Sequence, residues 1–134
     1  MSIWGTPLIL NPPDVKPDYS GIYIEQGNIS SSTGADSTTS QASRLRTHGY
    51  ILISDTNQYQ INCNIPRVYV YYYNQNQSII GSGGAWITPL PAIITPPSGA
   101  KYMRCVLSKS SGNVSPSDVT SFTVDEMERI INLP

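Results

Sequence analysis

The run RVYVYYY, from Arg67 to Tyr73, constrains the fold of this chain more than any other segment. Every second side chain of an extended strand points to the same face, so one face carries Val68, Val70 and Tyr72. The opposite face carries a cation and a row of hydroxylated rings, Arg67, Tyr69, Tyr71 and Tyr73. Aromatic and β-branched residues favour a pleated strand. We therefore expect a strand with one buried face and one exposed face that is suited to contact another molecule.

Similar alternation recurs along the chain between turn residues. In Lys101–Ser108, for example, one face collects Met103, Cys105 and Leu107, and the other Tyr102, Arg104 and Val106. Short strands separated by glycine, proline and asparagine turns are typical of sandwiches and barrels. The pattern predicts an all-β fold, an antiparallel β-sandwich, with strands near 20–25, 45–53, 58–63, 67–73, 91–95 and 101–108.

The beginning of the chain has a different composition. An apolar and aromatic peptide precedes three prolines between residues 12 and 17, and prolines exclude both helix and central strand. We expect residues 1–19 to be an extended anchor peptide and linker, with anchor contacts from Ile3, Trp4, Pro7, Leu8, Ile9 and Leu10. Residues 20–113 would form the sandwich. Within them, residues 30–43 are nearly all small or polar and predict a long surface loop.

Residues 114–134 are expected to form a C-terminal extension. The sequence TVDE, from Thr123 to Glu126, fits a capping box, in which the first side chain caps a helix and the glutamate reaches back. Met127, Ile130 and Ile131 then follow at helical spacing, and Pro134 would end the segment. These signals predict a short C-terminal helix.

Composition argues against several classes of function. The formal net charge is −1 and only 13% of the residues are charged, so the basic surface that nucleic-acid binding requires is missing. No apolar run approaches the ~18 residues of a membrane span, and the N-terminus lacks the features of a secretory signal. We expect neither nucleic-acid binding nor membrane insertion.

Few residues could bind a metal or catalyse a reaction. His48 is the single histidine, and zinc-ligand spacing is absent. No nucleophile elbow, phosphate-binding loop or pair of carboxylates suggests catalysis, so a non-enzymatic protein is expected. Asp14, Asp18 and Asp36 could contribute to a structural calcium site, although calcium-loop spacing is missing and no cofactor is expected. Cys63 and Cys105 are either two small buried thiols or a cross-strand disulfide.

Several segments in this order resemble the carbohydrate-binding-module-like jelly-roll domains of bacteriophage and prophage tail, baseplate and fibre proteins. The resemblance covers about residues 20–113. Its motifs are GIYI from Gly21, RVYVYYYNQNQ from Arg67, and TPPSGAKYMR from Thr95. The resemblance implies a jelly-roll of two stacked sheets with a concave face that contacts sugars. Carried over by position, the carbohydrate-binding residues would be Tyr69, Tyr71, Tyr102 and Arg104, with Trp86 on a rim loop.

Other roles for these residues stay open. The tyrosines could pack under the 30–43 loop or against another subunit, and Arg104 could be a structural cation. The leading expectation is a virion protein that adheres to host-surface glycans and joins other virion proteins through its N-terminal segment. The alternative is a purely structural capsid decoration or fibre subunit, whose tyrosine-rich face is an oligomer interface, for example in a homotrimer.

Overall fold

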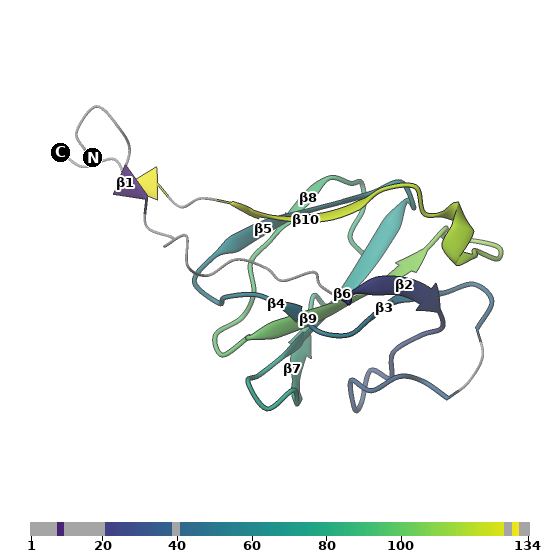
Figure 1. Cartoon of the computed structure of the whole chain (residues 1–134), viewed down its shortest axis with the longest axis horizontal. Helices are drawn as coiled ribbons and strands as arrows, with labels where there is room; N and C mark the ends of the chain where they lie inside the picture. Colours follow the sequence, from purple (N-terminus) through teal and green to yellow (C-terminus); the bar gives the residue numbers. More distant parts are fainter. Residues whose placement is uncertain (1–7, 10–20, 39–40, 128–129, 132–134) are drawn as a thin grey trace.

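A computed structural model of the chain describes residues 8–9, 21–38, 41–127 and 130–131. Two antiparallel sheets pack face to face, and Figure 1 shows β5, β8 and β10 in one layer above β2, β3, β4 and β9. The prediction of an all-β antiparallel β-sandwich is confirmed. Within these ranges no helix has the length and apolarity needed to cross a membrane.

The larger sheet is six-stranded and follows the order β2-β3-β9-β6-β7, with β4 pairing β9 as well. Its strands are β2 (Tyr23–Gln26), β3 (Leu45–His48), β4 (Ile51–Leu52), β6 (Arg67–Tyr73), β7 (Ile79–Ser82) and β9 (Tyr102–Ser108). β6 and β9 pair over their full lengths, with Arg67 opposite Ser108 and Tyr73 opposite Tyr102. These two long strands form the middle of the sheet.

The smaller sheet has three strands in the order β10-β5-β8. They are β5 (Gln58–Cys63), β8 (Ala92–Ile94) and β10 (Phe122–Met127). A short 3-10 helix, η1 (Pro116–Asp118), leads into β10. A separate two-stranded ladder joins β1 (Leu8–Ile9) to β11 (Ile130–Ile131).

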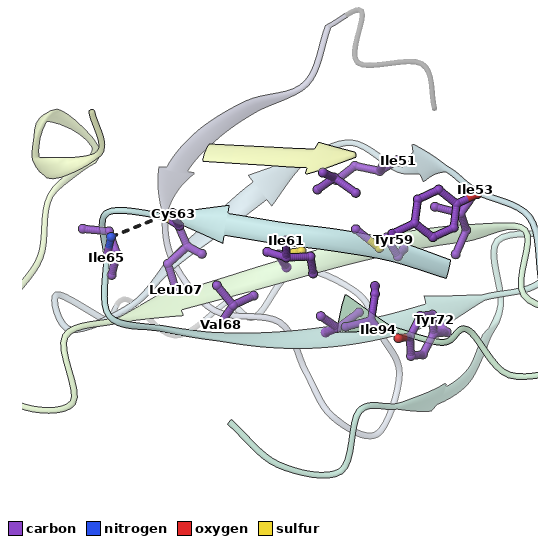
Figure 2. Packing of buried hydrophobic residues seen from close by; sticks show 14 of the residues in the cluster. Ile51, Ile53, Tyr59, Ile61, Cys63, Ile65, Val68, Tyr72, Ile94 and Leu107 are labelled. Carbon is purple, nitrogen blue, oxygen red and sulfur yellow. Dashed lines mark hydrogen bonds between the residues drawn. The ribbon is translucent and has the colours of Figure 1, made fainter. Parts of the chain in front are cut away.

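The core between the sheets uses the apolar faces that alternation predicts. Figure 2 shows Ile61 and Tyr59 of β5 packed among Val68, Tyr72 and Leu107 of the larger sheet. Fully buried side chains of this size each contribute about 1.5–3 kcal/mol by leaving water. Two thiols also lie in this core, and both are free rather than joined in a disulfide: Cys63 and Cys105.

The predicted C-terminal helix is wrong. Residues 122–127 form the edge strand β10 instead, paired with β5 so that Val124 lies opposite Ile61. Val124 is 2% exposed, whereas its neighbours Thr123 and Asp125 are exposed, which is the alternation of a strand. Burial of Val124 against the core outweighs the local capping-box signal, because tertiary packing commonly overrides helix propensity.

The polar segment after Tyr73 forms a turn that leads into a paired strand. Asn74 and Ser78 close a turn through the hydrogen bond from Asn74 N to Ser78 O (2.9 Å), and the chain then returns as β7. β7 includes Gly81 and Ser82, although glycine is unfavourable inside a strand. Antiparallel pairing with β6 stabilises this strand and outweighs the low strand preference of glycine.

Candidate functional site

The outer face of the larger sheet carries the residues that the sequence singled out. Successive positions of β6 and β9 on this face form rows, with Tyr69 opposite Val106, Tyr71 opposite Arg104 and Tyr73 opposite Tyr102. A second hydrophobic cluster lies here, distinct from the core between the sheets. Its buried members are Ile29, Tyr71, Tyr73 and Val106, and its half-buried members are Tyr50, Tyr69, Ile79, Trp86 and Tyr102.

The loop that starts at Gly27 covers one part of this face. Tyr73 is fully buried and its hydroxyl donates a hydrogen bond to the Gly34 carbonyl oxygen at 2.7 Å. Gly34 has φ of +73°, and a Cβ there would lie 2.7 Å from Tyr73 Cε2 and 2.9 Å from Ile79 Cβ. Only glycine allows the loop to lie this close to the ring.

Arg104 is held inside the protein beneath the same loop. It is 4% exposed, and its Nε and Nη2 both donate to the Thr47 carbonyl oxygen, at 3.1 and 2.6 Å. Nη2 also lies 2.7 Å from Oδ1 of Asp36, which arrives from the loop. Charge-assisted hydrogen bonds of this kind fix the guanidinium. Its geometry is that of a cation that fastens the loop to the sheet.

Tyr71 also lies below the surface, at 7% exposure. Its ring contacts that of Tyr69, with centroids 5.0 Å apart. Burial, with a smaller effect from Tyr69, raises the pKa of Tyr71 above the usual value. Tyr71 therefore contributes a buried ring to this cluster, whereas Tyr69 is half-buried.

Four aromatic rings on the outer face are half-buried and thus reach solvent: Tyr50, Tyr69, Trp86 and Tyr102. They form two edge-to-face pairs, which is a favoured aromatic geometry. Tyr69 and Trp86 have centroids 5.5 Å apart at 75°, and Tyr50 and Tyr102 have centroids 5.9 Å apart at 68°. The Tyr69 hydroxyl further hydrogen-bonds Ser82 Oγ at 3.1 Å.

Trp86 is held in place by backbone pairing of the residue that follows it. Ile87 and Val68 exchange two hydrogen bonds, of 2.7 and 3.1 Å, which attach the Trp86 segment to the start of β6. Two guanidinium groups lie over the indole ring, with the Cζ of Arg67 4.2 Å and that of Arg44 5.1 Å from its centroid. We call these three residues, with Ser108 between the arginines, the arginine cluster.

The structure thus places the predicted carbohydrate-binding residues on one face, at two depths. Tyr69, Trp86 and Tyr102 reach solvent, whereas Tyr71 and Arg104 lie beneath them. Sequence reasoning missed Tyr50 and Arg44 as members of this face. Arg67 had been assigned to the right face of its strand but was given no role.

Of the proposed anchor residues, only Leu8 and Ile9 belong to the described ranges. They pair antiparallel with Ile131 and Ile130. Ile3, Trp4, Pro7 and Leu10 lie outside the described residues, as do Asp14 and Asp18.

Other chemical groups in the described ranges are sparse. Nδ1 of His48 lies 3.3 Å from Glu25 Oε1, and the imidazole stacks on the Tyr23 ring. Across these ranges no set of three or more histidine, cysteine or acidic side chains gathers as a metal site would require. A hollow of about 210 Å³ lies between the sheets at the β10 edge, lined mainly by apolar groups such as Ile22, Ile51 and Phe122. Such a lining offers few groups to orient a ligand.

Comparisons with protein-family models, with curated proteins and with solved structures found no match to this chain. The function must therefore be argued from the chemistry of the outer face.

Proposed function

We propose that this chain is a non-enzymatic, carbohydrate-binding module of a phage particle that attaches to glycans on the host surface. The single observation that supports glycan binding is the set of half-buried rings on the outer face, Tyr50, Tyr69, Trp86 and Tyr102. The assignment to a phage particle rests on the sequence resemblance alone.

The chemistry of the face suits a saccharide. Aromatic rings offer flat surfaces to the C–H patches of a sugar, and phenolic hydroxyls and guanidinium groups offer hydrogen bonds to its oxygens. Each exposed ring is braced by another ring at its edge, so binding costs little side-chain entropy. Display of many copies on a particle would compensate for weak single sites.

The buried layer below the rings contributes rigidity. Tyr71, Tyr73 and Arg104 are each less than a tenth exposed and are fixed by hydrogen bonds or ring contacts. They act as positioning residues, and the exposed layer would touch the ligand. Substitutions that probe ligand contact therefore belong in the exposed layer.

A glycan array probed with the purified full-length chain tests the proposal. We expect binding to a restricted set of saccharides, weakened by Tyr69→Ala and by Tyr102→Ala at roughly 1–3 kcal/mol each, the range for losing an aromatic contact. Tyr23→Ala is the matched control, because Tyr23 is 54% exposed on β2, which β3 and β9 separate from β6.

Two outcomes would reject the proposal. One is the absence of binding to any saccharide on the array and to host cells. The other is that Tyr69→Ala dissociates an oligomer, measured by light scattering, without changing adhesion. In that case the tyrosine-rich face is an assembly interface and the structural alternative replaces the adhesive one.

A further inference from the structure

The arginine cluster brings two cations together at one end of the outer face. Arg67 begins β6, Ser108 ends β9 opposite it, and Arg44 directly precedes β3 on the other side of β9. Nη1 of Arg44 and Nη2 of Arg67 both donate to Ser108 Oγ, at 3.2 and 3.3 Å. Because both hydrogen bonds end at one oxygen atom, the guanidinium groups are neighbours.

No carboxylate in the described part of the chain forms an ion pair with either arginine. The two other arginines of the same face contrast with them. Arg46 lies 2.6 Å from Glu25 and Arg104 lies 2.7 Å from Asp36. Positive charge on this face is therefore neutralised beneath the loop and left unneutralised at the arginine cluster.

Nη1 of Arg44 also donates to the Ser43 carbonyl oxygen at 3.1 Å and to Ser43 Oγ at 3.3 Å, but the N–H groups of the two guanidiniums still outnumber the acceptors around them. Ser108 Oγ accepts a third hydrogen bond, from Ser110 N at 3.2 Å, although a hydroxyl oxygen has only two lone pairs. Among the residues that the structure describes, Nε of Arg67 is buried and has no hydrogen-bond acceptor. Buried polar groups in native proteins nearly always have a partner, so this donor is an unsatisfied polar group within the cluster.

Trp86 stabilises the two cations without neutralising them. The negative face of an indole ring attracts a guanidinium, and Arg67 and Arg44 both lie within reach of it. The ring holds the donors in place, and both arginines are only half-buried, so an incoming group can reach them. The arrangement is a preorganised set of donors that an oxyanion would complete.

We propose that Arg44 and Arg67, which Ser108 and Trp86 hold in position, bind an oxyanion, and that the saccharide bound by the outer face is acidic. The acidic group is a carboxylate, sulfate or phosphate carried by the sugar. The part about the saccharide rests on the proposed function, whereas the oxyanion site stands on the cluster alone.

The oxyanion site is tested without any saccharide. The chain has two tryptophans, so Trp4→Phe leaves Trp86 as the single indole and its fluorescence reports on the cluster. Sodium acetate, sodium sulfate and sodium phosphate are titrated separately at constant ionic strength, which sodium chloride maintains. We expect a saturable change with at least one of the three anions.

Variants identify the residues responsible. Arg44→Gln and Arg67→Gln in the Trp4→Phe background should each weaken the anion's affinity by about tenfold or more. Lys101→Gln is the matched control, because it removes one charge from an exposed position just before β9, at the opposite end from Ser108, and should change affinity less than about twofold. Urea unfolding of each variant verifies that it folds. If one arginine variant does not fold, the other is sufficient to test the oxyanion site.

The results separate the two proposals. Absence of a saturable response to all three anions, or equal loss in Lys101→Gln, overturns the oxyanion site. On a panel of matched neutral, carboxylated, sulfated and phosphorylated saccharides, preference for acidic members supports the inference and shows which acidic group is bound. Binding of neutral members alone overturns it while leaving the proposed function intact. Saturable anion binding without any saccharide binding supports the site and rejects the proposed function.

Discussion

The carboxylate of Asp36 lies 2.7 Å from Nη2 of Arg104, and this ion pair joins a polar surface loop to the middle strand of the larger sheet. Arg104 is almost completely buried, whereas the Asp36 side chain is 46% exposed. The pair keeps a cation satisfied beneath the aromatic surface and fixes the loop that covers Tyr73.

Removing the charge of Asp36 should therefore destabilise the fold. Asp36→Asn leaves Arg104 without its carboxylate, and we expect a loss of about 1–3 kcal/mol in the free energy of unfolding. Urea denaturation measures it. Asp125→Asn is the control, because it removes the same charge from an exposed position of β10, and equal effects of the two variants would contradict the role of the ion pair.

The close approach of the loop to Tyr73 gives a second prediction. Gly34→Ala should destabilise by about 2–4 kcal/mol, because a methyl group would add a steric clash to the cost of a positive φ. Gly112→Ala separates the two effects, since Gly112 has φ of +82° with nothing within 4 Å of an added Cβ. Gly112→Ala should lower the free energy of unfolding only by the cost of the positive φ, about 1–2 kcal/mol. Thermal or urea unfolding that ranks the two variants in the reverse order would show that the loop does not pack on Tyr73.

The assignment of residues 122–127 to a strand is testable with charges at neighbouring positions. Val124→Asp puts a carboxylate into the core opposite Ile61 and should cost roughly 3–5 kcal/mol. Thr123→Asp changes an exposed side chain and should cost less than about 1 kcal/mol. Equal tolerance of both substitutions in urea unfolding would argue against β10.

The buried thiols predict a pH dependence of stability. Burial, with a smaller effect from Cys63, raises the pKa of Cys105 to about 12 from a usual value of 9.0. Between these values the unfolded chain binds fewer protons than the folded one, so the free energy of unfolding should fall as pH rises from 9 towards 12. Burial also raises the pKa of Tyr72 and Tyr73 above the usual value, which extends the loss of stability above pH 10.

Urea midpoints at a series of pH values test this dependence. Cys105→Ala should show a weaker decline above pH 9, because one ionisable group has been removed. An unchanged slope in that variant would exclude the thiol as a cause. In the native protein at pH 7 neither Cys63 nor Cys105 should react with a thiol reagent, since both are buried.

Local sequence was sufficient for the central strands. The ranges 58–63 and 67–73 were predicted at their observed bounds, because strict alternation and flanking turn residues agree there. Residues 122–127 alternate over too few positions to outweigh a helix-capping pattern, and only their pairing with β5 decides the structure. The faces assigned to the tyrosines of residues 67–73 followed only from the alternation of side chains along a strand.

The depth of each side chain on the outer face could not be read from the sequence. Tyr71 and Tyr69 share a face and a strand, yet Tyr71 is buried and Tyr69 only half-buried, a difference that alternation along the strand does not predict. Asp36 lies in a run of small polar residues whose pattern gives no sign of a buried partner. The meeting of Arg44 and Arg67 at Ser108 likewise depends on strand order, which periodicity does not determine.

The central claim is that the half-buried rings and the arginine cluster of the outer face bind an acidic saccharide. Its most direct test is nuclear magnetic resonance of the full-length chain during titration with the best acidic saccharide from the array. The account predicts that the largest shifts occur at the Trp86 indole N–H, the Arg67 and Arg44 Nε–H groups, and the rings of Tyr69 and Tyr102. Shifts confined to the smaller sheet, or to the hollow lined by Ile22, Ile51 and Phe122, would contradict it.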